Sequence, residues 1–490
     1  MPDRAEFLVV GSGAGGSVSA LELARAGRDV LVLEEGQEHP LESYGQESAR
    51  ALRLLYRQGG MSPIVGSVPI GFAEGRCLGG STEVNSGFWH RTPPEMLLRW
   101  KAQFDFDGGA ESELEPHFAA AERALGVALS TGPRPPTTEV FGRGIRAMGW
   151  AYHEVPRAAP GCRNSNRCAS GCRAGKKQGM TRGFIPEARR HGARFMTNTK
   201  ALRLVHRSGR VTGVSVSHKR PDGTDESALI EADHVIVCGG PTQTPALLLR
   251  SGIARNVGRS LRIHPYLKVA AEFAVPVAAA EHALPLLQVR EFWPDIALGG
   301  AYFSRGQVAL TLSENWPDNR ELMEASDRMA HYYVAVRGTG RGSVRPGFLR
   351  GESTNLSYEL SSVDLRNLSS GLARLATLLL AGGARAVYPS VYGISRIVDE
   401  RGAVRWLDET LPRRALSLVT VHAFSSCPAG ERRDRCAVDS YGKVFGFSNL
   451  FVNDASMIPD SPGVNPQGTV MALAARNAQR LLASLPGGHS

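Results

Sequence analysis

A glycine-rich turn near the start of the chain constrains the fold more than any other feature. Gly11, Gly13 and Gly16 form the pattern GxGxxG directly after an apolar stretch at 7–10 and before a helical pattern at 17–26. A second apolar stretch, 29–33, comes next and is followed by Glu34. A strand, glycine turn, helix and second strand with a terminal acid open a doubly wound nucleotide-binding sheet. The sequence therefore predicts a dinucleotide site at this turn.

Each residue of the turn has a mechanical role in such a site. The first glycine makes the turn, the second lets backbone amides approach a pyrophosphate at the helix N-terminus, and the third lets helix and strand pack closely. Ala14, in the same turn, is predicted to contact the cofactor with them. Glu34 would accept hydrogen bonds from a ribose hydroxyl. This fingerprint alone does not distinguish FAD from NAD.

Further elements of the same kind recur along the chain. A strand is expected at 234–237 with a helix at 244–250, and another strand at 450–452 with a final helix at 469–482. The segment 332–347 alternates like hairpin strands, which indicates antiparallel sheet. The predicted fold is α/β: a discontinuous Rossmann-like FAD-binding domain with an inserted α+β substrate-binding domain. The first comprises 1–100, 180–265 and 411–490, and the second comprises 101–179 and 266–410.

Three sequence blocks identify the kind of nucleotide protein. GRCLGGSTEVNSGFWHRTP (75–93) resembles the flavin-loop signature of the glucose-methanol-choline oxidoreductases, and NLFVNDASMIPDSPGVNPQGTVMALAARNA (449–478) resembles their C-terminal signature. NVGRSLRIHP (256–265) is similar to a third block of that family, and the blocks follow the family order. The resemblance implies FAD as cofactor and oxidation of an alcohol by hydride transfer to the flavin N5.

The resemblance also implies roles for particular residues. Those expected to contact FAD are Gly79 and Gly80 with Asn85 at the flavin ring and diphosphate, Asp454 with Ala455 at the ribityl and diphosphate portion, and Asn465 with Pro466 beside them. Val84 stands where some relatives carry a histidine that bonds covalently to the flavin. The resemblance therefore implies that FAD is held without a covalent bond.

Alcohol oxidation on a flavin requires a base for the hydroxyl proton. His422 matches the family histidine and Asn465 its partner, which would hold the substrate oxygen. An imidazole with an ordinary pKa near 6.5 accepts a proton at neutral pH. Many relatives read His-Pro-x-Gly here, whereas His422 is followed by Ala-Phe-Ser-Ser, so the loop is expected to take a different path. His264 looks structural and His90 precedes a turn, so both are poorer candidates.

Three cysteines form a separate candidate site. Cys162, Cys168 and Cys172 are separated by five and then three intervening residues in a loop flanked by Arg and Lys. Clustered thiolates suit zinc or an iron-sulfur cluster. The spacing resembles the cysteine loop of bacterial sugar dehydrogenases in the same family, which implies a possible three-iron cluster that would pass electrons on singly. A disulfide, zinc with another ligand, and plain reduced thiols are the alternatives.

Composition limits the partners. The chain has 490 residues, of which 42% are hydrophobic and 21% charged, and no apolar run long enough to span a membrane. Its seven cysteines are too few for a disulfide framework, and its start leaves no room for a signal peptide, so we expect a cytoplasmic protein. The net charge of +10 is scattered along the chain, which argues against nucleic acid.

The expected partners are a small-molecule alcohol and either oxygen or a separate electron acceptor. A sugar or an aminoglycoside-type hydroxyl is favoured, as in antibiotic biosynthesis, because the insertions lack a long apolar loop. Two alternatives remain: an FAD-containing lyase of the same fold, and a catalytically silent flavoprotein module. An NAD dehydrogenase would leave the second and third blocks unexplained.

Overall fold

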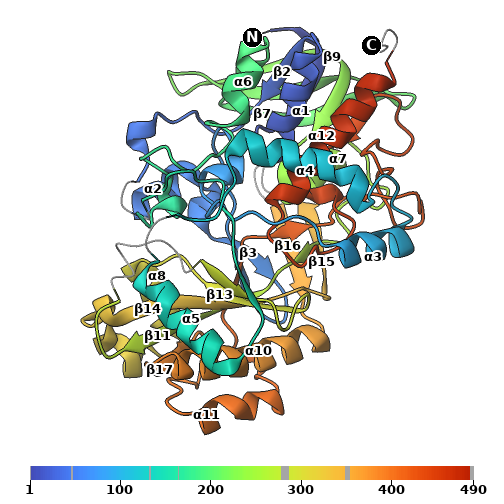
Figure 1. The fold of residues 1–490 in the computed structure, drawn as a ribbon. Coiled ribbons are helices and arrows are strands. Elements are labelled where there is room, and N and C mark those ends of the chain that lie inside the picture. Colours follow the sequence, from blue (N-terminus) through green and yellow to red (C-terminus); the bar gives the residue numbers. More distant parts are fainter. Residues whose placement is uncertain are drawn as a thin grey trace.

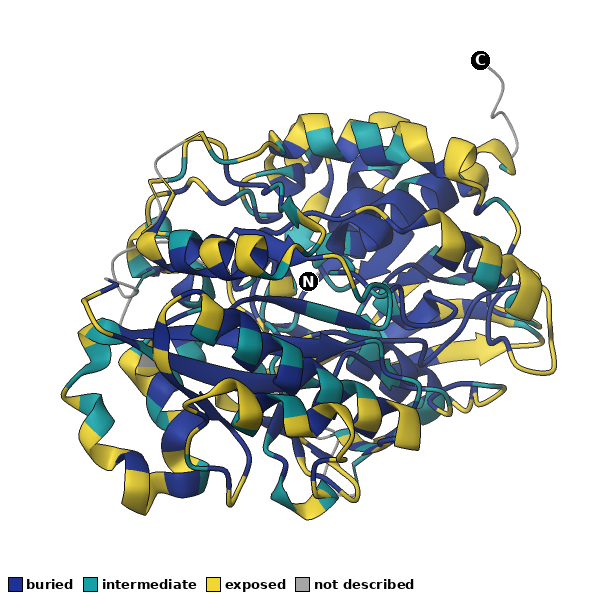
Figure 2. Ribbon diagram, turned by 60° about the horizontal axis from the view of Figure 1, so that its bottom comes forward, coloured by how far each residue is buried: buried dark blue, intermediate teal, exposed yellow. Residues whose placement is uncertain are grey.

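The computed structural model describes residues 2–45, 48–131, 134–163, 165–277, 286–347 and 354–485. They build two large sheets, one in the upper and one in the lower half of Figure 1. Buried hydrophobic side chains gather into one main core around each sheet. In Figure 2 the strands of both sheets are largely buried, whereas the outer helices expose one face. No helix in these ranges is long and apolar enough to cross a membrane.

The first sheet has seven strands, and its centre is parallel. Strand β1 pairs in parallel with β2 and β9, and β20 joins the other side of β9. Parallel strands covered on both faces are apolar throughout, which is the pattern at 7–10 and 30–33. The strands are β6 (Arg194–Met196), β2 (Val30–Leu33), β1 (Arg4–Val10), β9 (Asp225–Val237), β8 (Arg210–Lys219), β7 (Thr199–Arg207) and β20 (Leu450–Val452). The predicted nucleotide-binding sheet is confirmed.

Strand β9 is much longer than the predicted 234–237. Its last residues pair in parallel with β1 and β20, while its first half pairs antiparallel with β8. That first half alternates between exposed and partly buried side chains, because one of its faces lies in solvent. The apolar run at 234–237 corresponds only to the buried end of β9. The sequence pattern therefore predicted less than half of the residues of this strand.

Helices cover the first sheet in Figure 1, with α1 and α12 side by side and packed together. They and their neighbours are α1 (Ala14–Arg25), α12 (Gln467–Ala483), α4 (Glu111–Leu125), α6 (Phe184–Arg190) and α7 (Gly240–Arg250). Helix α4 packs against α12 and α6 packs against α1. The other helices are α2 (Ser48–Leu55), α3 (Pro94–Phe104), α5 (Pro136–Met148), α8 (Arg305–Leu312), α9 (Trp316–Asn319), α10 (Ser362–Ala381) and α11 (Glu400–Val404).

The second sheet has eleven strands and is mostly antiparallel. Helix α10 packs across it, against β13, β14 and β17, and carries α5 and α11 on its other sides. The strands are β15 (Arg341–Pro346), β16 (Thr354–Glu359), β3 (Ser62–Val65), β4 (Ile70–Phe72), β18 (Leu418–Thr420), β11 (Tyr266–Phe273), β14 (Met329–Val336), β13 (Ile296–Gly300), β12 (Leu287–Val289), β5 (Tyr152–Glu154) and β17 (Ala384–Pro389).

The segment 332–347 does contribute antiparallel strands, but they do not form a hairpin with each other. Strand β14 pairs with β11 and β13, whereas β15 pairs with β16. The short link between β14 and β15 is held instead by Asp364 at the start of α10, whose carboxylate accepts from the backbone N–H groups of Thr339 and Gly340. Alternation shows that a segment is a strand, but it does not show its neighbour.

The division of the chain into two domains stays a prediction, and some elements lie across the expected boundaries. Strands β3, β4 and β18 belong to the second sheet although they fall within 1–100 and 411–490. Helix α4 falls within 101–179 but packs against α12 of the first layer. These strands have three or four residues each, too short for a pattern that identifies their sheet.

The start of α1 is packed directly on the chain that follows β20. A Cβ atom at Gly15 would lie 1.9 Å from the carbonyl oxygen of Asn453, whereas one at Gly13 would meet no heavy atom within 4 Å. Gly15→Ala therefore should destabilise the protein by about 3 kcal/mol, because helix and strand must move apart. Gly13→Ala should change stability by less than about 1 kcal/mol. Urea unfolding of the two variants tests this, and equal stabilities would contradict it.

Candidate active site

A cavity of about 520 Å³ collects most of the predicted site residues. Its walls come from both sheets and from the loops between them, and its size is typical of a cofactor or ligand site. The predicted residues in its lining are Gly11, Gly13, Ala14, Glu34, Gly80, Asn85, His422, Asp454, Ala455, Asn465 and Pro466. Gly16, Gly79 and the three clustered cysteines are not part of the lining.

The glycine turn is closed by backbone on two sides and open on the third. Gly11 has φ +104°, and a Cβ there would lie 2.3 Å from the carbonyl oxygen of Cys238 on the neighbouring strand. A Cβ on Gly16 would lie 1.9 Å from the carbonyl oxygen of Gly11. Gly13 faces open space in the cavity at the N-terminus of α1. The turn thus leaves its amides accessible where an anionic diphosphate binds best.

Glu34 binds the glycine turn itself. One carboxylate oxygen accepts from the backbone N–H and the hydroxyl of Ser12, at 3.1 and 2.7 Å, and the other accepts from the backbone N–H of Gly36 at 2.8 Å. Burial raises the pKa of Glu34. A carboxylate has about four acceptor positions, so capacity for a ribose hydroxyl remains. The sequence indicated the ribose role but not this internal one.

The flavin loop, which we define as residues 77–87, lies against the first glycine turn. The backbone N–H of Gly79 donates to the hydroxyl of Ser12 at 3.0 Å. A Cβ on Gly80 would lie 3.2 Å from the Cα of Gly13, and both Gly79 and Gly80 have positive φ. Farther along, the Asn85 amide donates to the Gln467 side chain at the start of α12. Two glycine motifs that are distant in sequence therefore form one surface of the cavity.

Asp454 fixes the far side of that surface. It follows β20, and its carboxylate accepts from the backbone N–H of Gly240 at 2.8 Å, from the hydroxyl of Thr244 and from the backbone N–H of Ser456 at 2.7 Å. Gly240 begins α7 directly after β9. Asp454 thus ties together the ends of two adjacent parallel strands, the edge where α/β sheets bind ligands.

His422 is placed by a two-residue ladder outside both large sheets. Strands β10 (Arg262–Ile263) and β19 (Ala423–Phe424) pair antiparallel with Ile263 opposite Ala423. The next pair in this register is His264 and His422, and the backbone N–H of His264 donates to the carbonyl of His422 at 3.3 Å. Their ring Nδ1 atoms are 3.1 Å apart. The sequence pattern ranked His264 as structural, yet it directly contacts the predicted base.

Two more side chains complete the surroundings of His422. The Tyr266 hydroxyl lies 2.8 Å from Nδ1 of His422, and the Asn465 amide nitrogen lies 3.3 Å from Nε2. An amide nitrogen only donates, so Nε2 is the acceptor and Nδ1 carries the proton, shared between Tyr266 and His264. Burial lowers the pKa of His422 to about 3, so the ring is neutral at physiological pH.

Sequence reasoning missed Tyr266 and the polar wall that continues from it. Tyr266 and Lys268 lie on one face of β11, and His331 and Tyr333 lie on one face of β14, with Lys268 opposite Tyr333. All four line the main cavity. The only sequence signal was alternation: side chains two apart share a face of a strand, and here the polar ones alternate with core residues.

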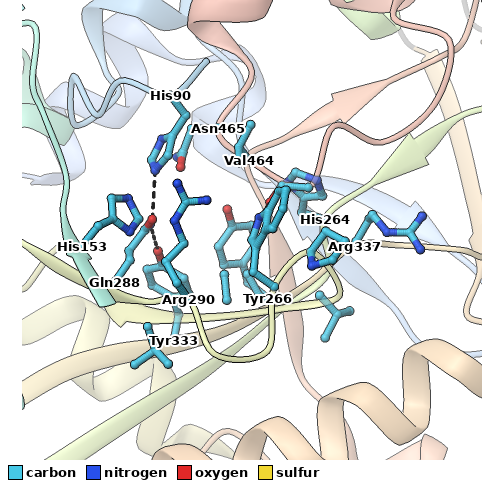
Figure 3. A pocket seen from close by; sticks show the side chains of 17 residues that line it. His90, His153, His264, Tyr266, Gln288, Arg290, Tyr333, Arg337, Val464 and Asn465 are labelled. Carbon is cyan, nitrogen blue, oxygen red and sulfur yellow. Dashed lines mark hydrogen bonds between the residues drawn. The ribbon is translucent and has the colours of Figure 1, made fainter. Parts of the chain in front are cut away.

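A second, small pocket of about 20 Å³ opens beside Asn465 (Figure 3). His90 Nε2 lies 2.9 Å from the Gln288 side-chain oxygen, and the Gln288 amide donates to the Tyr333 hydroxyl at 2.6 Å. Burial lowers the pKa of His90 to about 3. Figure 3 shows Arg290 directed toward the same space. The pocket thus continues the polar wall behind Asn465, and His90, expected to be a plain turn residue, lines it.

The loop after His422 bends at Ser425. This serine occupies the position of the glycine in the family pattern His-Pro-x-Gly and adopts φ +61°, in the left-handed region. Its backbone is held on both sides, by the N–H bond to the carbonyl of Ala455 at 3.3 Å and by the Ser260 hydroxyl bond to its own carbonyl at 2.6 Å. The bend thus places a strained serine where the family pattern has glycine, and the expected change of path stays a prediction.

The cysteines show no metal site. Among the described residues, no group of three or more His, Cys, Asp or Glu side chains is placed to hold a metal ion. The seven cysteines form no disulfide with one another. Cys168 and Cys172 are half-buried in the cysteine loop, which we define as residues 165–179. The iron-sulfur prediction thus has no support in the arrangement of these thiols.

Comparison with known proteins identifies the relatives of the chain. Models of the GMC oxidoreductase family match residues 52–266 and 346–474, and an FAD binding domain model matches residues 6–45. The chain is 38% identical to an uncharacterised GMC-type oxidoreductase of Sinorhizobium fredii, over 98% of this chain and 95% of the relative. It is 27% identical to a long-chain-alcohol oxidase of Arabidopsis thaliana, over 99% of this chain and 69% of the relative.

Solved structures share the fold. A pyridoxine 4-oxidase structure superposes with a TM-score of 0.74 at 19% identity, covering 97% of this chain and 99% of that one. A formate oxidase structure gives a TM-score of 0.74 at 16% identity, with both chains covered completely. The predicted Rossmann-like fold with a second, largely antiparallel part is confirmed.

The strained bend next to His422 predicts a stabilising substitution. Ser425→Gly should raise the free energy of unfolding by about 1 kcal/mol, because glycine adopts positive φ without the steric penalty of a side chain. Ser426→Gly is the matched control, since its hydroxyl donates to the carbonyl of Pro241 at 2.7 Å, and its loss should destabilise the protein. Chemical denaturation of both variants measures the two changes. A Ser425→Gly protein less stable than the parent would show that the bend carries no strain.

Proposed function

Because this chain belongs to the GMC oxidoreductase family, we propose that it oxidises an alcohol with FAD bound in the main cavity. One observation is the main support for this proposal. A neutral, buried histidine presents its Nε2 atom beside the Asn465 amide, in the same cavity that both glycine motifs line. That is the arrangement that proton removal from a hydroxyl requires.

The residues of the cavity fit FAD. Gly13 leaves open space at the N-terminus of α1, where backbone amides favour a diphosphate, and Gly80 faces it from the flavin loop. Glu34, with acceptor capacity left, would hold the ribose, and Asp454 lies at the strand ends. Val84 is apolar, so we propose that FAD is held without a covalent bond, and acid precipitation would then release all of the flavin. When bound, FAD supplies the acceptor for the hydride of the alcohol carbon.

We propose that His422 is the base and Asn465 its partner. A hydroxyl oxygen within hydrogen-bond distance of both would donate its proton to Nε2 and accept a bond from the Asn465 amide. Tyr266 and His264 hold the Nδ1 side of the ring, so the free lone pair stays on Nε2. The hydrogen bond from His264 to Ser461, at 2.7 Å, fixes the second imidazole in turn. Together they keep the base oriented without any charged partner.

The walls favour a polar substrate. Beyond His422 the cavity is lined by hydroxyl, amide, imidazole and amine groups of Tyr266, Lys268, Gln307, His331 and Tyr333. Such groups can bind several hydroxyls of one substrate, in addition to the bonds that Tyr266, Lys268, His331 and Tyr333 make within the protein. We therefore propose a sugar or aminoglycoside-type hydroxyl as substrate, in a biosynthetic setting such as that of antibiotics. A long-chain alcohol is the alternative that the Arabidopsis relative suggests.

Oxygen is our proposed electron acceptor, since several similar proteins carry the name oxidase. A separate acceptor is the alternative. The iron-sulfur cluster that would favour single-electron transfer has no support in the placement of the cysteines. Seven cysteines without a disulfide among them are typical of a reducing compartment, which supports the proposed cytoplasmic location.

Anaerobic mixing tests the proposal. The purified protein is added to sugars, aminoglycosides and alkyl alcohols while the oxidised-flavin band near roughly 450 nm is followed. A polar alcohol should bleach the band, and His422→Ala should slow this bleaching about 10²- to 10⁴-fold, the usual contribution of a general base. His191→Ala, an exposed histidine at the end of α6, should leave the rate unchanged. Flavin that no alcohol reduces would favour the lyase or the silent module, and bleaching that is unaffected by His422→Ala would show that His422 is not the base.

The pKa of His422 sets the pH dependence. The neutral imidazole is the proton acceptor and is present above its pKa, so a pKa lowered to about 3 extends the active form to acid pH. The rate constant of flavin reduction should therefore stay constant from pH 8 down to about 5. A stopped-flow series at saturating substrate measures it. A rate that halves near the ordinary histidine pKa of about 6.5 would show that His422 is not desolvated in the working enzyme.

A further inference from the structure

The cysteine loop lies directly against the flavin loop, and Ala169 is its one residue in the lining of the cavity. Lys177 is buried, with 3% of its surface exposed. Its ammonium group donates to the carbonyl oxygens of Glu83 and Asn85, at 2.6 and 2.8 Å, and to that of Cys168 at 3.3 Å. These three bonds use all three donors of an ammonium. Glu83 and Asn85 flank Val84 in the flavin loop, so one side chain holds both ends of this segment.

Few groups offset the cost of burying this amine. Burial of a charged ammonium is costly, and the favourable interaction with the Glu83 carboxylate offsets only part of that cost. Burial accordingly lowers the pKa of Lys177. The bonds to the flavin-loop carbonyls are thus what the chain gains by burying this group.

Arg157 repeats the arrangement one residue farther along. Its guanidinium donates twice to the carbonyl oxygen of Ser86, at 3.1 and 3.0 Å, and once to the sulfur of Cys168 at 3.3 Å. The backbone N–H of Lys177 donates to the sulfur of Cys172, also at 3.3 Å. Both thiols are therefore acceptors for the groups that hold the flavin loop.

We propose that the cysteine loop is a thiol-bearing clamp, in which Lys177 and Arg157 position residues 83–86 for the cofactor and modification of Cys168 or Cys172 loosens them. Lys177 is a positioning residue and Cys168 and Cys172 are the modification site. This inference rests on FAD binding, which it shares with the proposed function, and it is independent of substrate and of His422.

Peroxide is the modifying reagent that suits such a thiol. The thiolate sulfur attacks one peroxide oxygen, a sulfur–oxygen bond forms, the oxygen–oxygen bond breaks and hydroxide leaves. The sulfur loses two electrons and the peroxide gains them. The product is a sulfenic acid, which is bulkier than the thiol that it replaces beside Arg157. Cys162, Cys168 and Cys172 are partly exposed, whereas Cys77, Cys238, Cys427 and Cys436 are buried, so the reagent reaches the first three thiols before the others.

Flavin release from the intact holoenzyme separates positioning from general stability. Flavin fluorescence reports loss of FAD on heating, and tryptophan fluorescence reports unfolding. Lys177→Met should release flavin at least 10-fold faster at a temperature where the fold is intact, Lys177→Arg should restore part of the retention, and Lys176→Met, at the exposed neighbour, should match the parent. Release and unfolding that shift together in Lys177→Met would overturn the positioning role.

The role of the two thiols can be tested without a lysine variant. This second experiment is valid even if Lys177→Met does not fold. Hydrogen peroxide added to the parent holoenzyme should speed flavin release several-fold, dithiothreitol should reverse the effect, and Cys168→Ser with Cys172→Ser should abolish it. Mass spectrometry confirms which thiols are oxidised. Oxidised Cys168 or Cys172 with unchanged flavin retention would overturn the proposal. Because no alcohol is added, an enzyme without alcohol oxidase activity gives the same readout.

Discussion

The two-residue ladder between β10 and β19 is the constraint on which the active site depends. It lies outside both large sheets, yet its register sets His264 opposite His422 and brings their Nδ1 atoms to 3.1 Å. The same stretch of chain then enters the second sheet as β11, which places the Tyr266 hydroxyl at the same Nδ1 atom of His422. One short antiparallel pairing thus determines which groups surround the base, and all of them are uncharged at neutral pH.

The nucleotide end depends on a different interaction, the contact between two glycine-rich segments. The Ser12 hydroxyl donates to Glu34 and accepts from the backbone N–H of Gly79, so that the first turn, the second strand and the flavin loop meet at one hydroxyl. This contact requires glycine on the flavin-loop side, because Gly80 has a positive φ and a Cβ there would lie 3.2 Å from the Cα of Gly13, whereas Gly13 faces open space. The surface of the cavity at this end is therefore formed by the backbone of the two glycine-rich segments, and the buried carboxylate of Glu34 lies behind it.

Sequence patterns predicted the parts of the molecule whose chemistry is local. The glycine turn, Glu34 and the strand before Asp454 are each recognisable within a few residues, and all were found in or beside the cavity. His264 and Tyr266 could not be assigned to the site, because their role comes from pairing with residues more than 150 positions away. Alternation at 332–347 indicated antiparallel strands, but it did not show that β14 pairs with β11 and β13 or that β15 pairs with β16. The bend at Ser425 shows a third limit: a positive φ occurs at a residue type that does not signal it.

The bonds of Lys177 have a consequence for how this chain can diverge. A single amine satisfies three backbone carbonyls drawn from two loops that are about ninety positions apart in sequence. Backbone oxygens do not depend on residue type, so the flavin loop can change its side chains freely while the lysine cannot be exchanged for a smaller or neutral residue. An insertion in either loop would move these carbonyl oxygens out of hydrogen-bond distance of the buried Lys177 ammonium group. The lengths of the two loops should therefore change together in evolution. A related protein without the cysteine loop needs other hydrogen-bond donors to keep the conformation of its flavin loop.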